Sequence, residues 1–344
     1  MVTAKDVNRE LEKFLPKKIT KKWVNNALGR PEFGFDFPSA QASIINPVWD
    51  FLSRGGKRWR PALMLLACES SGGNPRDALP FTVLPELIHN GTIMVDDIED
   101  NSTLRRGRPS THLVFGTDIA INAGNSMYYL PFVRVFRNPK IPAKTKAIIY
   151  DLYAEEMLRL SFGQALDIHW HNGHNNNVTE KQYLEMCSYK TASLARFAIQ
   201  AGAVLGGASK KQLKAFRDFA TSIGVAFQIQ DDILNVNPGK GWGKAIGDDI
   251  VEGKRTLLVI RALSRLPKNK SRRLIKILDS RSNSAKEISE AISLIEETGA
   301  VEYAENAAKK LVSVSSKRLQ SVLPESRAKK LLNEFASYII ERKN

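Results

Sequence analysis

Two clusters of acidic residues follow apolar helical runs with the spacing of a site for a hard metal ion. These residues are Asp96, Asp97 and Asp100 after the run 87–95, and Asp231 and Asp232 after the run 223–229. Helical residues three and four positions apart share a face, so the three carboxylates of the first cluster are expected to converge. Carboxylate oxygens suit Mg²⁺, which normally takes one or two of them together with substrate phosphates. One cluster alone would also fit a solvated helix end, but the pair predicts a Mg²⁺-bound diphosphate between them.

Basic residues follow each acidic cluster, as phosphate binding requires. They are Arg105 and Arg106 after the first cluster and Lys244 and Lys254 after the second. Acids at a helix C-terminus face the negative end of the helix dipole, so a nearby cation is also expected to compensate them. The glycine-flanked stretch 55–61, which contains Lys57 and Arg60, offers a further anion site at the start of a helix.

Apolar residues recur at three- and four-residue spacing through most of the chain and strand signals are almost absent, which predicts an all-α fold. The longer helices are expected at residues 75–97, 118–136, 143–170, 179–205 and 210–235. Capping boxes mark four helix starts, at Thr3 with Asp6, Thr179 with Gln182, Ser209 with Gln212 and Ser284 with Glu287. No linker or repeat divides the chain, so residues 1–344 are predicted to form one large helical bundle, with 1–40 as a peripheral N-terminal segment.

The composition is that of a globular protein, with 43% hydrophobic and 25% charged residues. The formal charge of +15 favours anionic partners, although no nucleic-acid-binding motif or basic helix is present, and no nucleic acid is expected. The two cysteines, Cys68 and Cys187, lie in apolar helical patterns and predict neither a disulfide framework nor a thiolate metal site. With no apolar leader or bilayer-length run, a soluble cytoplasmic protein is expected.

The sequence Asp96-Asp97-x-x-Asp100 followed by Arg105-Arg106-Gly107 resembles the first aspartate-rich motif of the trans-isoprenyl diphosphate synthases, the polyprenyl synthetase family. Other blocks agree in order: Gly55 to Pro61, Glu86 to His89, Gly163-Gln164, Lys190-Thr191, Phe227 to Asp232, and Gly253-Lys254. The resemblance covers roughly residues 45–265. It implies a prenyltransferase like geranylgeranyl diphosphate synthase, a homodimer that joins isopentenyl diphosphate to an allylic diphosphate and releases pyrophosphate.

The resemblance also implies roles for individual residues. Isopentenyl diphosphate would be held by Lys57, Arg60, His89 and Arg106. Three Mg²⁺ would hold the allylic diphosphate, with Asp96, Asp100 and Asp231 as principal ligands and Asp97, Asp232 and Asp248 or Asp249 acting directly or through water. Phosphate would be contacted by Arg105, Lys190, Lys244 and Lys254, while Thr191 and Gln228 would border the reacting carbons. The allylic diphosphate would ionise, the isopentenyl double bond would attack, and a proton would be lost, for which pyrophosphate is a candidate acceptor.

Product length depends, in this family, on side chains one and two turns upstream of the first acidic motif. One helical turn advances about 5 Å, similar to one isoprene unit. Gly91 and Thr92 are not bulky there, so a twenty-carbon product is expected rather than a farnesyl product. Ile88, and Tyr128 from another helix, are further candidates for the floor of the pocket.

Two positions depart from the family pattern: Asn235 stands where many relatives carry a third acid, and Asn125 where many carry aspartate. The alternatives are a longer-chain or farnesyl synthase, then a terpene cyclase or a non-catalytic synthase subunit. A cyclase would be expected to replace the second aspartate motif, and a non-catalytic subunit would not need intact metal motifs. Peripheral membrane contact during product release is the most that is expected of membrane association.

Overall fold

The chain folds almost entirely into helices, and the computed structural model describes residues 3–238 and 246–342. It forms two compact units: unit 1 comprises Met1–Leu152 and Ala198–Ala208, and unit 2 comprises Tyr153–Phe197 and Ser209–Asn344. The prediction of an all-α fold is confirmed. The prediction of one domain stays a prediction, and Lys244 lies outside the described residues.

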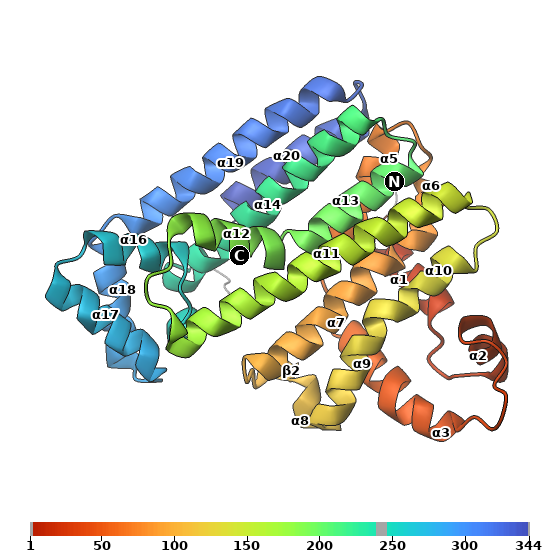
Figure 1. Ribbon diagram of the computed structural model, residues 1–344, viewed down its shortest axis with the longest axis horizontal. Helices are drawn as coiled ribbons and strands as arrows, with labels where there is room; N and C mark the ends of the chain where they lie inside the picture. The colour runs from red at the N-terminus through yellow and green to blue at the C-terminus, as the bar shows by residue number, and fades with distance from the viewer. Residues whose placement is uncertain (1–2, 239–245, 343–344) are drawn as a thin grey trace. The chain divides into compact units, whose positions relative to one another are not determined.

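Unit 1 contains the first acidic cluster and the glycine-flanked basic stretch (Figure 1). Its α-helices are α1 (Ala4–Phe14), α2 (Lys21–Ala27), α3 (Phe37–Ala40), α4 (Asn46–Ser53), α5 (Trp59–Ser70), α6 (Pro75–Ala78), α7 (Val83–Glu99), α8 (Thr111–Phe115), α9 (Thr117–Tyr129) and α10 (Val133–Phe136). A π-helical turn, η1 (Gln41–Ile45), and two 3₁₀ turns, η2 (Leu79–Phe81) and η3 (Leu130–Phe132), connect some of them. Strand structure in the described chain is confined to β1 (Leu104–Arg105), which pairs antiparallel with β2 (Arg108–Pro109).

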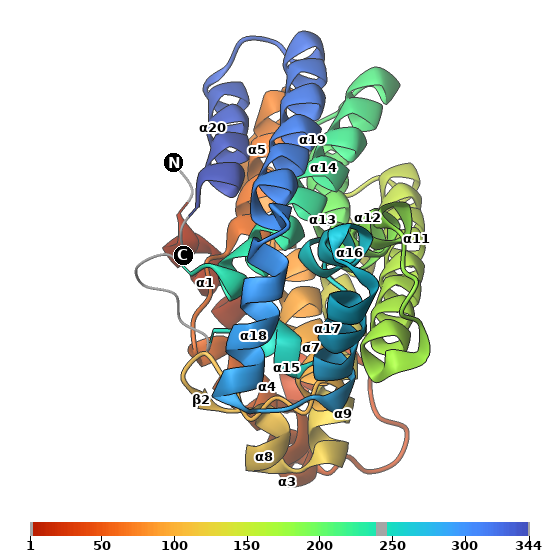
Figure 2. The ribbon, with the colours of Figure 1, turned by 90° about the vertical axis from the view of Figure 1, so that its left-hand side faces the viewer.

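Helices α7 and α9 run side by side in unit 1, as Figures 1 and 2 show. Glycines permit this close approach: a Cβ added at Gly91 would lie 2.6 Å from the carbonyl oxygen of Gly124. A Cβ added at Gly124 would in turn lie 3.1 Å from the carbonyl oxygen of Gly91. The helix that carries the first acidic cluster is therefore held directly against α9 by backbone contact.

Unit 2 contains the second acidic cluster and the C-terminal half of the chain. Its elements are η4 (Trp170–His174), α12 (Glu180–Lys190), α14 (Lys210–Val236), α15 (Asp248–Val251), α16 (Leu257–Arg265), α17 (Lys268–Ser280), α18 (Ala285–Glu296), α19 (Ala300–Val322) and α20 (Arg327–Glu341). Two helices, α11 (Ala143–His169) and α13 (Ser193–Leu205), contribute residues to both units. Every helix in the described ranges is too short or too polar to cross a membrane.

Helix α14, which carries Asp231 and Asp232, packs mainly against α19 and also against α20 (Figure 2). The buried face of α19 begins with Ala300, Ala304 and Ala308. Residues four apart share a helix face, and a row of alanines lets the neighbouring helix come close. The second acidic cluster therefore lies on a helix fixed along its length by the C-terminal pair.

Three predicted helices are interrupted, and the one expected at 75–97 is divided into α6, the 3₁₀ turn η2 and α7. The helix expected at 118–136 ends at Tyr129, because Pro131 in the 3₁₀ turn that follows has no N–H group to continue the ladder. The helix expected at 179–205 is broken between Lys190 and Ser193, where neither proline nor glycine marks a break. None of these three segments is the single helix expected there.

Three of the four capping boxes are confirmed, at Thr3, Thr179 and Ser209. Ser284 does precede a helix, but its side chain makes no capping hydrogen bond. Glu287 instead accepts a hydrogen bond from Arg273 at 3.2 Å. The box predicted at this position was wrong because a cation from α17 reaches the glutamate.

Candidate active site

The first acidic cluster ends α7, and its middle residue is already paired. Asp97 is buried, and its Oδ1 accepts a 2.7 Å hydrogen bond from Nε of Arg105 in β1. The expected compensating cation is thus present. Asp97 faces Arg105, and in the described residues three or more acidic, histidine or cysteine side chains are nowhere gathered into one candidate metal cluster. Asp96 and Asp100, four residues apart, remain on one face of the helix end.

The basic stretch of unit 1 lines a cavity of about 420 Å³ with residues of α7 and of the β1–β2 turn. Four residues predicted to bind isopentenyl diphosphate lie in this lining: Lys57, Arg60, His89 and Arg106. The guanidinium of Arg60 lies 4.2 Å from the Trp59 ring centroid, and burial lowers the pKa of Arg60 to about 10. Its Nε is buried and has no hydrogen-bond partner in the described part of the chain. An anion in this cavity would satisfy that donor.

Not every cation in the cavity is equally available to a ligand. Arg58 forms a buried ion pair with Glu86, and its Nε donates to Asn8 at 3.0 Å. Arg106 donates to Asn90 at 3.0 Å and lies over the Phe51 ring, with 4.9 Å between the guanidinium carbon and the ring centroid. These contacts fix the shape of the cavity and orient the cations that line it.

The second acidic cluster is part of a hydrogen-bonded chain within unit 2. Tyr183 donates to one oxygen of the buried Asp232 at 2.6 Å, and Gln228 donates to the other at 2.9 Å. Thr191 donates to Oε1 of Gln228 at 2.8 Å. Thr191 and Gln228, both predicted to border the reacting carbons, are thus in contact with each other, and Asp232 orients Gln228 by accepting its hydrogen bond.

Two lysines of unit 2 that were predicted to contact phosphate, Lys190 and Lys254, face carboxylates. Nζ of Lys190 lies 2.6 Å from Oδ2 of Asp167 in α11, and Nζ of Lys254 lies 3.5 Å from Oδ1 of Asp249. Although burial favours the neutral acid, the charges of Lys190 and Lys254 lower the pKa of Asp167. Both lysines therefore have carboxylate partners within unit 2.

Asp231 and Asn235 each make a contact that the sequence did not predict. Asp231 forms a 2.9 Å ion pair with Arg342, whose guanidinium carbon lies 4.0 Å from the Phe227 ring centroid. The buried Asn235 accepts a hydrogen bond from the backbone N–H of Asp249 at 3.1 Å. The amide at 235 therefore anchors the start of α15, which an acid would do only with an added buried charge.

The break after α12 carries Lys190 and Thr191, and glycines on two neighbouring helices make room for it. A Cβ at Gly163 in α11 would lie 2.3 Å from the backbone nitrogen of Lys190. A Cβ at Gly224 in α14 would lie 2.5 Å from Cα of Ala192. The break is thus wedged between the backbones of α11 and α14.

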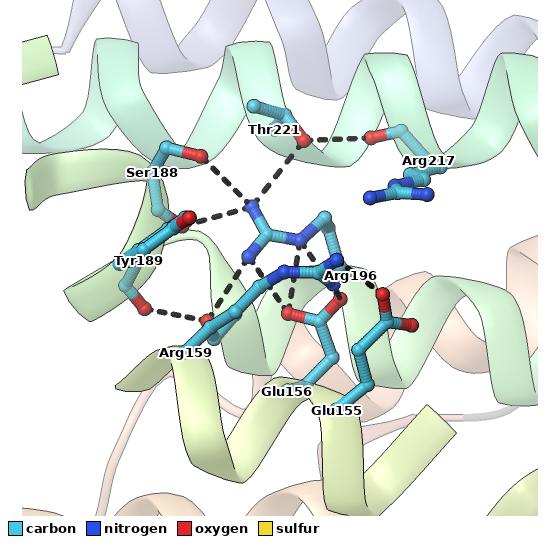
Figure 3. A network of polar contacts seen from close by, with 9 residues as sticks. Glu155, Glu156, Arg159, Ser188, Tyr189, Arg196, Arg217 and Thr221 are labelled. Atoms are coloured by element: carbon cyan, nitrogen blue, oxygen red, sulfur yellow. Dashed lines mark hydrogen bonds and ion pairs between the residues drawn. The ribbon is translucent and has the colours of Figure 1, made fainter. Parts of the chain in front are cut away.

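A buried ion pair supports the same break (Figure 3). Arg196 makes two-pronged contacts with Glu156 at 2.7 to 3.0 Å, and the two side chains are 2% and 1% exposed. Arg196 also donates to the backbone carbonyl of Ser188 at 2.8 Å and to Thr221 at 3.3 Å. One guanidinium therefore joins α11, α12 and α14 around the break.

Comparison with known proteins assigns the family. A sequence profile described as polyprenyl synthetase matches residues 41–295. The chain belongs to the polyprenyl synthetase family. It is 39% identical to a short chain isoprenyl diphosphate synthase of Methanothermobacter thermautotrophicus, over 88% of this chain and 91% of that one. It is 35% identical to a geranylgeranyl diphosphate synthase of Methanosarcina mazei, over 84% and 86%.

Solved structures agree with this assignment. The geranylgeranyl pyrophosphate synthetase of Pyrococcus horikoshii superposes with a TM-score of 0.86 at 30% identity, over 98% of this chain and 96% of that one. This polyprenyl synthetase is therefore a prenyltransferase with the fold of the isoprenyl diphosphate synthases, as the sequence resemblance implied.

Three contacts in this polyprenyl synthetase were missed by sequence reasoning. Asp167 lies four residues after Gly163, on the same face of α11, and that spacing could have indicated it. Tyr183 lies on α12 two turns before Lys190, within an unremarkable helical pattern. No local signal points to Arg342, which is 111 residues from Asp231.

Acidification is expected to destabilise this polyprenyl synthetase partly through His89. Burial, together with the charges of Arg60 and Arg106, lowers the pKa of His89 well below its usual value. The folded protein then binds fewer protons than the unfolded chain below about pH 6.5, so stability falls as pH falls, by at most about 1.4 kcal/mol per pH unit from this group. Between pH 7.5 and 5.5 the melting temperature should fall less for His89→Gln than for the wild type. Equal falls in the two proteins would contradict this role of His89.

Proposed function

We propose that this chain condenses isopentenyl diphosphate with an allylic diphosphate to form chiefly geranylgeranyl diphosphate. The observation that carries the proposal is the cavity of unit 1, where the buried Nε of Arg60 lacks a partner in the described chain and Lys57, His89 and Arg106 share the lining. Such a site suits a diphosphate, because guanidinium groups bind phosphate oxygens through paired N–H donors. The uncharged His89 would add a neutral hydrogen-bonding group among these cations.

The acidic clusters would hold Mg²⁺, with Asp96, Asp100 and Asp231 as principal ligands and Asp97 and Asp232 in support. The donors fit a hard cation, since all are carboxylate oxygens, and Oδ2 of Asp97 is buried without a hydrogen-bond partner among residues 3–238 and 246–342. When bound, Mg²⁺ supplies charge stabilisation for the departing pyrophosphate. We expect three Mg²⁺ per site, as in the family pattern.

The chain's own residues would orient the substrates and offset charge. Lys190 and Lys254, paired with Asp167 and Asp249, would contact phosphate as point charges, and Arg105 would hold Asp97 in place. Thr191 and Gln228 would border the reacting carbons, in an orientation supported by Asp232. The proposal requires no side-chain nucleophile.

Product length is proposed to depend on the surface that α7 and α9 share in unit 1. Ile88 is fully buried, and a Cβ at Gly91 would meet the ring of Tyr128 at 3.1 Å. Tyr128 thus fills the space where a bulky residue 91 would lie, and it would support a floor about one and a half turns before the acidic motif. One relative, 34% identical, is named a geranylfarnesyl diphosphate synthase, so a twenty-five-carbon product is the alternative.

Replacing Thr92 with phenylalanine is expected to shorten the main product by one isoprene unit, and Tyr128→Ala to lengthen it. Thr92 is half-buried and lies one turn before Asp96. A phenylalanine there would fill space about 5 Å from the acidic motif, where the growing chain would otherwise pass. Chromatography of dephosphorylated products measures the length. Gly91→Ala is the contrasting variant, since its Cβ would collide with the backbone of α9 and lower the melting temperature. Unchanged products from both length variants would contradict the assigned floor.

The expected homodimer and peripheral membrane contact also remain proposals. An exposed apolar row on α11, Leu158, Phe162 and Leu166, is 61%, 62% and 37% exposed and has the four-residue spacing of one helix face. Such a row supports self-association, because contiguous exposed apolar surface commonly marks an interface. Two buried cysteines without a disulfide bond support a reducing cytoplasmic compartment.

The deciding experiment incubates purified protein with Mg²⁺, labelled isopentenyl diphosphate and each of three allylic primers: dimethylallyl, geranyl and farnesyl diphosphate. A single dominant twenty-carbon alcohol after dephosphorylation, lost with EDTA, would support the full proposal. Elongation to another length would correct the product alone. A folded protein that elongates no primer would overturn it and favour a cyclase or a non-catalytic subunit.

A further inference from the structure

A second cationic cavity lies in unit 1 beneath the N-terminal helices. It has a volume of about 330 Å³, within the lower range of small-ligand pockets, and it shares no lining residue with the cavity of Arg60. The lining comes from α1, α2, α10 and the segment after α10: Lys13, Phe14, Trp23, Asn26, Ala27, Val133, Arg134, Arg137, Asn138 and Pro139. These residues lie outside the sequence motifs assigned to prenyl transfer.

The charges of this cavity are unbalanced. Lys13, Arg134 and Arg137 line it, while the nearest carboxylate in contact with them is Glu10. Glu10 lies 2.7 Å from Nζ of Lys13 but 3.9 Å from Nη2 of Arg134, beyond hydrogen-bond distance. Among the described residues, Glu10 thus pairs with Lys13 and approaches Arg134, while Arg137 adds a third positive charge to the lining.

Arg134 has a donor that the described residues leave unsatisfied. Its Nε is buried without a hydrogen-bond partner in residues 3–238 and 246–342, and its guanidinium carbon lies 5.3 Å from the Phe14 ring centroid. A buried unsatisfied donor on a charged group is costly, and an anion bound to the Arg134 guanidinium would offset that cost. Phe14, Trp23 and Pro139 add apolar walls beside the cations.

We propose that this cavity is a binding site for a phosphate group, separate from the sites of the two diphosphate substrates. The cations and the open Nε donor match phosphate oxygens, and the apolar walls would accept carbon next to the phosphate. The phosphate could belong to a free anion or to a lipid headgroup. Leu28, 65% exposed directly after α2, and Phe33, 94% exposed, are apolar groups that a lipid surface would cover.

The test titrates the full chain in EDTA, which removes Mg²⁺-dependent binding, with two probes. Inorganic pyrophosphate is followed by tryptophan fluorescence, with Trp23→Phe as the check on the reporter. Vesicles of phosphatidylcholine with and without phosphatidic acid are followed by co-sedimentation. The variant Lys13→Ala/Arg137→Ala removes two exposed side chains of the cavity, so folding should be preserved. The matched control, Lys140→Ala/Lys144→Ala, removes the same charge from nearby exposed positions outside the lining.

The cavity variant should weaken binding of at least one probe about tenfold or more, while the control keeps wild-type affinity. Selective loss of pyrophosphate binding would support the site and identify a free anion as a ligand. Selective loss of phosphatidic acid vesicle binding would support the site and identify a lipid headgroup. No binding of either probe by the wild type would overturn the proposal. Equal affinities of the two variants for both probes would also overturn it, because binding would then depend on overall surface charge and not on the cavity.

Discussion

Replacing Asp96 with alanine is expected to reduce prenyl chain elongation by at least about a thousandfold, since several kcal/mol of charge stabilisation at the leaving group would be lost. Asp96 lies in the last turn of α7, four residues before Asp100, and these two carboxylates share a face. Steady-state assays with labelled isopentenyl diphosphate measure the loss, and calorimetry of Mg²⁺ with pyrophosphate reports binding independently of turnover. Both readouts should fall together.

A matched control is Asp77→Ala, which removes an exposed carboxylate from α6 in the same unit. It should leave both readouts within about twofold, because surface substitutions away from special features have small effects. Near-wild-type elongation by Asp96→Ala would contradict the proposed ligand role. If the control lost as much activity, the effect would come from the loss of any negative charge in this unit and not from the motif.

Glu156→Ala is expected to destabilise the protein by about 3–5 kcal/mol, since it leaves the guanidinium of Arg196 buried without its counter-ion. Both side chains are almost fully buried, and the pair holds the segment that carries Lys190 and Thr191 (Figure 3). Urea denaturation followed by circular dichroism measures the change. Prenyl transfer should also fall in the fraction that remains folded, because the break would lose its support.

The neighbouring Glu155→Ala is the control for this prediction. Glu155 is 48% exposed and pairs with Arg159, so its loss should cost less than about 1 kcal/mol. The double variant Glu156→Leu/Arg196→Met should recover much of the stability lost by Glu156→Ala, since removing both charges leaves neither unpaired. Equal destabilisation by Glu155→Ala and Glu156→Ala would contradict the stabilising role assigned to the buried Glu156–Arg196 pair.

Local patterns were enough to predict most helices and the positions of both acidic clusters. Apolar spacing placed α11 and α14 within a residue or two of their observed ends, and three capping boxes formed where expected. These signals succeed because helix formation and capping depend on residues within one or two turns. The four basic and imidazole groups of the unit 1 cavity came from the family resemblance and do line one cavity.

Contacts between distant residues could not be predicted. The break near Thr191 depends on Gly163 and Gly224, which belong to other helices, so its own sequence looks continuous. The pairing of Asp231 with Arg342, 111 residues away, depends on where α14 and the C-terminal segment lie in space. The sequence therefore indicated which charged residues belong to the site, but not which distant side chains form ion pairs with them.

The break between α12 and α13 keeps its backbone groups hydrogen-bonded. Its amides remain bonded, since Thr191 and Ala192 donate to the carbonyl oxygen of Cys187 at 3.0 and 3.1 Å. The carbonyl of Tyr189, which the break would otherwise leave open, accepts the hydroxyl of Ser193 at 2.5 Å. Amide hydrogen exchange at 191 and 192 should therefore be as slow as in the flanking helices. Any opening that admits substrate or releases product must then bend the chain elsewhere, with Lys190 and Thr191 carried along as a fixed unit.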